Sequence, residues 1–178
     1  MAITITENRT FAYSSQTYNV QFFTDDIHTT VTADAAVVTD WINGIQPRRV
    51  LIVGLDAEWR PSFGSPQYNP VATLQLCVGN RCLIYQIIHS VWIPASLASF
   101  LSDSRQFGDV TFVGVGIKTD LEKLQRDYGI GGVLKITICI SDVAVLFKVT
   151  WQLLFKVTWQ LLFKVTWQLL FKLLFKLL

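Results

Sequence analysis

Hydrophobic and polar residues alternate along the first half of the chain in runs that predict β-strands. Residues 18–32 alternate on both sides of a polar turn at residues 24–26, so two strands are expected there. Five apolar or small residues, 51–55, predict a buried strand that ends at a carboxylate. The runs VATLQLCV and RCLIYQI flank Gly79-Asn80 and predict a hairpin, and VTFVGVG predicts one more strand.

Three other stretches have the spacing of helices. The first begins at Asp34 as a predicted N-cap and ends before Gly44 and Pro47, with one apolar face formed by Val37, Val38, Trp41 and Ile42. Residues 94–101 predict a short helix, and TDLEKLQRDYG predicts a longer one that stops at its glycine, with Leu121, Leu124 and Tyr128 facing inward. The order of strands and helices predicts an α/β fold with a mixed sheet.

The charge is unevenly distributed along the chain. The sequence has 178 residues, 51% hydrophobic and 16% charged, which predicts one folded domain rather than a disordered chain. All 13 acidic residues lie at or before Asp142, and five of the 15 basic residues follow it, so residues 1–142 carry a net charge of −3. A nucleic-acid site must therefore concentrate positive charge locally.

The cysteines and the N-terminal residues bear on the compartment. Cys77, Cys82 and Cys139 are odd in number and form no CxxC pair, so neither a disulfide framework nor a structural zinc is expected, and a reducing compartment fits. The start, MAITITENRT, does not resemble a secretory signal. A nuclear or cytosolic protein that is not secreted and has no membrane partner is the expectation.

The chain changes character after Asp142. The unit LFKVTWQL occurs three times from Leu146 and then decays into LFKLLFKLL. Identical copies with a period of eight residues are typical of repeated coding DNA or a flawed gene model, because natural solenoid repeats are roughly 20 residues or longer and drift. Residues 143–178 are therefore predicted not to form a domain, and their alternating pattern is an aggregation hazard.

Two carboxylates, Asp56 and Glu58, stand at the end of the predicted buried strand. Residues i and i+2 of a strand share a face roughly 6.6 Å apart, so these groups repel and one pKa rises unless a cation compensates them. Mg²⁺ suits such hard oxygen ligands. Asp120 opens a helix after another strand, where ligands collect in α/β sheets. The alternatives are a solvated pair at a strand end and a helix-capping acid.

The segments LIVGLDAEWRPSF, NPVATLQLCVGNRCLIYQI and FVGVGIKTDLEKLQRDYG resemble plant Werner syndrome-like 3′-5′ exonucleases over roughly residues 10–133. This DEDD family has an RNase H-like (DnaQ-like) fold, a mixed sheet flanked by helices. The resemblance implies that Asp56 and Glu58 hold two catalytic Mg²⁺ or Mn²⁺ ions and that Asp120 binds one of them through water. It also implies two-metal hydrolysis at the 3′ end of DNA or RNA, which releases nucleoside 5′-monophosphates.

The chain departs from the family pattern downstream. The family's third motif is a Tyr followed four residues later by an Asp. Here Tyr128 is the last tyrosine, Gly132 lies four residues on, and no acidic residue follows Asp142. The exonuclease domain, residues 10–142, is thus expected to be incomplete at its C-terminus, with Asp142 as a candidate substitute. A catalytically impaired relative that binds nucleic acid or a protein is the alternative function.

Several other residues are candidates for contacts with nucleic acid. Trp59 and Arg60 follow the acid pair and could stack on or neutralise a 3′-terminal nucleotide, with core packing the alternative for Trp59. Lys118, Lys123 and Arg126 could contact phosphate, with a solvated helix face the alternative. A helicase or another protein partner could act in trans.

The segment GVGIKT carries a remote alternative, a nucleotide-binding oxidoreductase. It follows a strand but has Thr119 where a dinucleotide-binding loop has its third glycine, and the acidic residue at the end of a following strand is missing. The acid pair and Asp120 favour the nuclease over this alternative.

Overall fold

The computed structural model describes residues 4–8, 15–22, 24–47, 49–62, 68–103, 107–131 and 137–139. The predictions for Asp142 and for the repeats in residues 143–178 lie outside the described residues.

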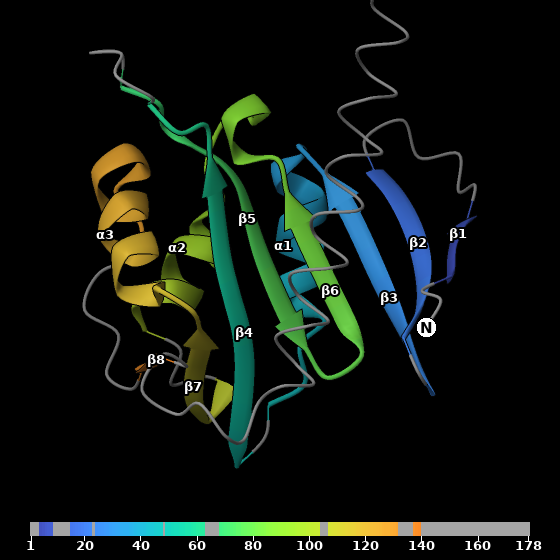
Figure 1. The fold of residues 1–178 in the computed structure, drawn as a ribbon. Coiled ribbons are helices and arrows are strands. Elements are labelled where there is room, and N and C mark those ends of the chain that lie inside the picture. The colour runs from blue at the N-terminus through green and yellow to red at the C-terminus, as the bar shows by residue number, and fades with distance from the viewer. Residues whose placement is uncertain are drawn as a thin grey trace, which may run out of the picture.

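The described strands form one mixed eight-stranded sheet in the order β1-β2-β3-β6-β5-β4-β7-β8 (Figure 1). Neighbours pair in parallel at β3–β6, β4–β7 and β7–β8, and the other neighbours pair antiparallel. The strands are β1 (Thr4–Asn8), β2 (Ser15–Phe22), β3 (Asp25–Thr32), β4 (Val50–Trp59), β5 (Val71–Val78), β6 (Arg81–Tyr85), β7 (Asp109–Gly114) and β8 (Thr137–Cys139).

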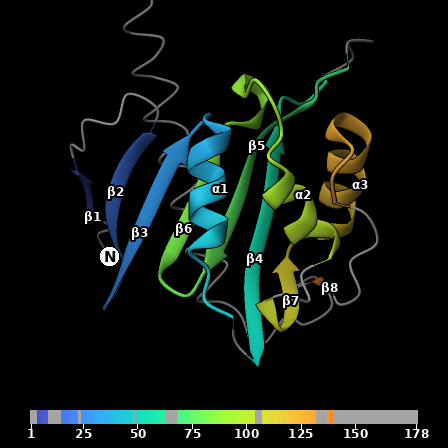
Figure 2. The same cartoon turned by 180° about the vertical axis from the view of Figure 1, so that it is seen from behind.

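The helices gather on one face of this sheet, as the view from behind shows (Figure 2). They are α1 (Ala35–Asn43), the short 3₁₀ turn η1 (Ile87–His89), α2 (Ala95–Ser102) and α3 (Ile117–Tyr128). The predicted N-cap of α1 is confirmed, because Asp34 Oδ1 accepts a hydrogen bond of 2.8 Å from the Ala36 N–H. None of the described helices is long and apolar enough to cross a bilayer.

The main core lies between the helices and the sheet. Alternation along β4 sends Leu51, Val53, Leu55 and Ala57 into this core, where side chains from α1, α2 and α3 also pack. A smaller cluster occupies β2, β3 and β6, and consists of Tyr18, Val20, Ile27, Val31 and Ile84. Asp56 and Glu58 alternate with the core residues, so they belong to the face of β4 opposite the main core.

The predicted mixed α/β fold is confirmed, including the two strands around residues 24–26 and the turn at Gly79-Asn80. Strand β1, which pairs with β2, was not predicted.

The expectation for the cysteines is wrong in one respect. A disulfide joins Cys77 to Cys82. The two residues face each other across the β5–β6 hairpin with Cα atoms 4.3 Å apart. The spacing rule missed them because their proximity comes from the strand register and not from a CxxC turn.

Candidate functional site

Two elements supply the predicted carboxylates. Asp56 and Glu58 lie near the carboxyl end of β4, just before a register shift between Glu58 and Trp59. Asp120 lies in the first turn of α3, which begins after Gly116 in the left-handed conformation with φ 68°. Helix α3 packs beside β4, and the side chains of Ile117, Leu121 and Leu124 hold it on the main core.

These carboxylates lie within one another's electrostatic field. Asp120 is only 5% exposed, and burial, followed by the charges of Asp56 and Glu58, raises its pKa to about 7. Burial and the charge of Glu58 raise the pKa of Asp56 to about 6, against a hydrogen bond from the Ala57 N–H. Burial also raises the pKa of Glu58. The tertiary structure thus couples Asp120 to the pair on β4, although α3 follows β4 by more than 50 residues.

The site contains a buried carboxylate oxygen that has no partner and could ligate a cation. Asp120 Oδ2 is buried and has no hydrogen-bond partner. In the part of the chain that the structure describes, no three His, Cys, Asp or Glu side chains are gathered into a formed metal cluster. Three mutually repelling carboxylates without a cation are expected to stand apart. The donor set itself, three carboxylates with an orphaned buried oxygen, fits a hard divalent cation such as Mg²⁺ or Mn²⁺.

Two polar residues of β5 lie opposite the β4 carboxylates. Gln75 pairs with Asp56 and Thr73 with Glu58 in the antiparallel ladder, so their side chains share one face. Both are buried, and Gln75 Nε2 donates a hydrogen bond of 2.7 Å to Thr73 Oγ1. The carbonyl oxygen Gln75 Oε1 has no partner. Sequence reasoning missed this pair, whose signal is two polar residues at i and i+2 inside the apolar run VATLQLCV.

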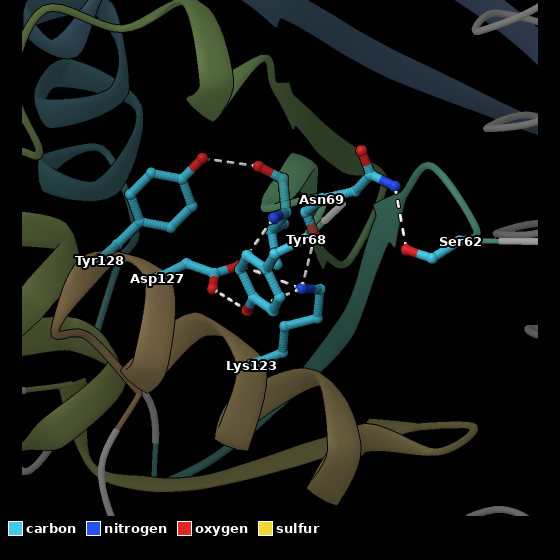
Figure 3. A network of polar contacts seen from close by, with 7 residues as sticks. Ser62, Tyr68, Asn69, Lys123, Asp127 and Tyr128 are labelled. Carbon is cyan, nitrogen blue, oxygen red and sulfur yellow. Dashed lines mark hydrogen bonds and ion pairs between the residues drawn. The ribbon is translucent and has the colours of Figure 1, made fainter. Parts of the chain in front are cut away.

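A second polar network anchors α3 to the segment before β5 (Figure 3). Lys123 Nζ donates to Tyr68 Oη at 3.0 Å and to the Asn69 carbonyl at 2.7 Å, and it lies 3.3 Å from Asp127 Oδ2. Asp127 also accepts hydrogen bonds from Tyr68 Oη and, at 2.7 Å, from the Val71 N–H. We call Lys123, Asp127 and Tyr68 the α3 clamp.

The two charged side chains of the clamp are buried, whereas Tyr68 is 53% exposed. The Lys123 and Asp127 side chains are 10% and 1% exposed. Burial would raise the pKa of Asp127, but the hydrogen bonds from Tyr68, Val71 and Lys123, together with the Lys123 charge, outweigh it and lower the pKa below its usual value. Beside the clamp, Tyr128 Oη donates to the Val71 carbonyl at 2.6 Å. Sequence reasoning missed Asp127 and Tyr68. The i, i+4 spacing of Lys123 and Asp127 is a signal for that pair, but no local signal points to Tyr68.

The candidate nucleic-acid residues differ in accessibility. The Lys118 side chain is 88% exposed and lies 4.0 Å from Glu122, and Arg60 and Arg126 are exposed. Trp59 is half-buried against the main core, with the Lys123 ammonium 5.1 Å from its ring centroid. The solvated helix face considered for Lys123 is wrong, because this side chain is buried.

A pocket of about 280 Å³ opens between the end of β4 and α3. It is lined by Trp59, Ser62, Tyr68, Asn69, Thr119, Glu122, Lys123 and Arg126. The pocket adjoins the carboxylates in sequence at two places, since Trp59 follows Glu58 and Thr119 precedes Asp120. None of the three candidate carboxylates lines the pocket itself.

The glycines of GVGIKT have structural roles. A Cβ on Gly114 would overlap the carbonyl oxygen of Leu55 on the neighbouring strand. Gly116 is the N-cap of α3 with a positive φ. These roles explain the glycines without a dinucleotide.

Comparisons with known proteins find similar sequences and a similar fold. The chain is 42% identical over 97 residues to a 3′-5′ exonuclease of Arabidopsis thaliana, covering 53% of this chain and 31% of that protein. It is 32% identical over 112 residues to a 3′-5′ exonuclease of Drosophila melanogaster, covering 61% of this chain and 29% of that protein. The chain thus spans about a third of the length of these relatives. No family model matches it.

The fold is similar to that of a solved exonuclease domain. The exonuclease domain of Aedes aegypti Nibbler superposes with a TM-score of 0.51 at 14% identity, over 64% of this chain and 53% of that chain. The exonuclease domain of EXD2, soaked in Mn and GMP, gives a TM-score of 0.49 at 22% identity, over 65% of this chain and 57% of that chain. The chain is similar in sequence to proteins named 3′-5′ exonucleases, and its fold is the RNase H-like fold of an exonuclease domain.

Proposed function

We propose that this chain carries the metal-binding carboxylates of a 3′-5′ exonuclease that acts on DNA or RNA. The observation that carries the proposal is the coupling of Asp120, with its orphaned oxygen, to Asp56 and Glu58. Buried carboxylates that raise one another's pKa lack a compensating positive charge. A divalent cation supplies that charge, and the relatives' name indicates the reaction.

Asp56, Glu58 and Asp120 would hold Mg²⁺ or Mn²⁺, and two ions are proposed. When bound, such ions activate a water and stabilise the charge that develops on phosphate during phosphodiester hydrolysis. The side chains themselves would orient and ligate the ions through their carboxylate oxygens. Gln75 and Thr73 form the polar floor opposite Asp56 and Glu58.

We propose that the pocket beside α3 receives part of the 3′-terminal nucleotide. Trp59 offers an aromatic face, and Arg60 offers an exposed cation next to it. Lys118 and Arg126 are exposed on α3 and can reach phosphate. The phosphate role predicted for Lys123 is harder to reconcile with its geometry, because its ammonium already meets three oxygens.

A catalytically impaired relative that still binds nucleic acid or a protein is the second candidate function. The observation that favours it is that residues 129–178 contain no tyrosine, so they do not hold the Tyr-to-Asp motif that the resemblance implies. Asp120 argues against the alternative of a nucleotide-binding oxidoreductase. Its carboxylate stands in the first turn of α3, where a dinucleotide phosphate would have to approach.

The test is release of a labelled 3′-terminal nucleotide from a 3′-overhang substrate in Mg²⁺. Loss of one ligand should cost at least as much as loss of a ligand's hydrogen-bond partner, which is typically 10- to 100-fold. We expect this chain to run at least roughly 100-fold more slowly than a relative with the third motif. Grafting that motif in place of residues 143–178 should restore the rate.

The matched controls use aspartates. Asp56→Ala in the graft should abolish release, whereas Asp40→Ala, an exposed acid on α1, should leave it unchanged. A graft that stays inactive while it binds the substrate would favour the impaired relative. Full family rate from the unmodified chain would show that another residue, with Asp142 the first suspect, replaces the missing acid.

A further inference from the structure

We propose that Lys123 is a positioning residue, which through the α3 clamp holds Asp120 against the carboxylates of β4. This inference rests on the proposed function and adds a role for residues that are not proposed to ligate the metal. It replaces the phosphate contact expected for Lys123 from the sequence. The role is to set the orientation of α3 relative to the end of β4.

The first step is that Lys123 is fully occupied inside the fold. A lysine ammonium has three donors, and three oxygens surround this one: Tyr68 Oη, the Asn69 carbonyl and Asp127 Oδ2. The ammonium also lies 4.2 Å from the Tyr68 ring centroid and 5.1 Å from that of Trp59. Figure 3 shows the side chain turned from α3 toward the segment before β5.

The second step is that the clamp ties α3 to the segment before β5, and that the Lys123 ammonium also contacts the ring of Trp59 at the end of β4. Trp59 directly follows Glu58 on β4, and Lys123 lies three residues after Asp120 on α3. Residues 120, 123 and 127 share one side of the helix, because positions i, i+3 and i+7 recur on one face. The stripe they form flanks the apolar stripe of Leu121 and Leu124, which packs on the core.

The third step compares how strictly the polar stripe and the apolar stripe fix the position of α3. The hydrophobic effect is not directional, so apolar burial by itself fixes the orientation of a helix less strictly than hydrogen bonds do. Hydrogen bonds lose strength steeply when they are misaligned. For a carboxylate about 5 Å from the helix axis, a roll of about 10° moves the oxygens by about 1 Å, given the helix dimensions. A displacement of about 1 Å is enough to cost a factor of about 100 in a positioned site.

The fourth step is that the clamp adds no net charge to the electrostatic field at the carboxylates. Lys123 is paired with Asp127, so the α3 clamp is neutral overall. Buried ion pairs contribute little to stability compared with apolar residues of similar volume, and their best-attested use is to specify one arrangement. A neutral, directional and buried pair next to Asp120 therefore fits a positioning role better than a stabilising one.

The experiment measures Mn²⁺ binding to the full chain by electron paramagnetic resonance, together with thermal unfolding. We expect Lys123→Met to weaken Mn²⁺ binding by about 10- to 100-fold, the usual effect of removing a residue that orients a metal ligand. It should also lower the melting temperature, because Asp127 is left buried without its cation. Gln125→Met, on the exposed side of α3, is the matched control and should change neither quantity.

The double variant Lys123→Met with Asp127→Asn separates positioning from stability. Removing both charges should restore most of the melting temperature, because no buried charge remains unpaired. Mn²⁺ binding should stay weak, because the directional contacts are gone. Recovery of Mn²⁺ affinity together with stability would overturn the inference and make Lys123 a purely structural residue.

The controls distinguish this inference from the proposed function. If Asp56→Ala leaves Mn²⁺ binding of the wild-type chain unchanged, the metal site itself is wrong, and the role of Lys123 falls with it. If Asp56→Ala abolishes binding but Lys123→Met binds Mn²⁺ as tightly as Gln125→Met, the metal site stands and only the positioning role is overturned.

Discussion

Gln75 lies directly opposite Asp56 in the β4–β5 ladder, and its side-chain oxygen is buried without a hydrogen-bond partner. The amide nitrogen is satisfied by Thr73, so the orphaned atom is the one that could accept a hydrogen bond or ligate a cation. An unsatisfied buried acceptor costs about 1–3 kcal/mol. Gln75 therefore occupies its position at some cost to the free energy of folding.

Gln75→Met should change the free energy of unfolding by less than about 1 kcal/mol, because loss of one hydrogen bond is offset by loss of the orphaned oxygen. Leu74→Ala, on the core face of the same strand, should cost about 2–5 kcal/mol. Urea unfolding of both variants in the absence of divalent metal makes the comparison. Equal destabilisation by the two would mean that Gln75 Oε1 has a partner in solution.

The stability of the metal-free chain should decrease as the pH rises from about 4 to about 7. The pKa of Asp120 is raised from 3.8 to about 7, so the folded state binds this proton more tightly than the unfolded state. The stabilisation is complete below the unfolded pKa of 3.8 and is lost as the pH rises through about 7. Asp56, with a pKa of about 6, acts in the same direction.

Calorimetry in EDTA checks this pH dependence. Asp120→Asn should flatten the curve, whereas Asp25→Asn, an exposed position in β3, should leave it as in the wild type. Added Mn²⁺ should stabilise the wild-type chain most at the upper end of the range, because its ligands must be deprotonated. A wild-type melting temperature that rises steadily from pH 4 to pH 7 in EDTA would contradict the coupling of these carboxylates.

Gly114→Ala should be far more destabilising than Gly116→Ala. A Cβ on Gly114 would overlap the backbone oxygen of Leu55, so β4 and β7 would have to separate. We expect a loss of about 3 kcal/mol or more, or failure to fold. Gly116 has open space around its Cβ position, so only the left-handed backbone, φ 68°, opposes alanine there, at a cost of about 1–2 kcal/mol. Denaturant unfolding ranks the two, and the reverse order would refute the close approach.

The Cys77–Cys82 disulfide should be detectable by counting thiols. In denaturant without a reductant, one thiol, that of Cys139, should react, and three should react after reduction. The bond closes a short loop that the hairpin already constrains, so replacing both residues with serine should cost only about 1–2 kcal/mol, at the low end of the usual range. Three reactive thiols before reduction would show that the cysteines are free.

Local sequence patterns were enough to predict much of the fold. Alternation in residues 50–59 predicted that Asp56 and Glu58 share a face, and turn chemistry predicted the bend at Gly79-Asn80. The N-cap at Asp34 was also predicted from the sequence. These features depend on residues within a few positions of each other, where the periods of strands and helices and the geometry of turns decide the outcome.

The tertiary structure alone decided which distant residues meet. Lys123 reads as a surface residue on a polar helix, yet it is buried because Tyr68, 55 residues away, folds over it. Cys77 and Cys82 are joined because the strand register places them opposite each other. The raised pKa of Asp120 depends on how α3 docks beside β4, a long-range packing arrangement that no local period encodes.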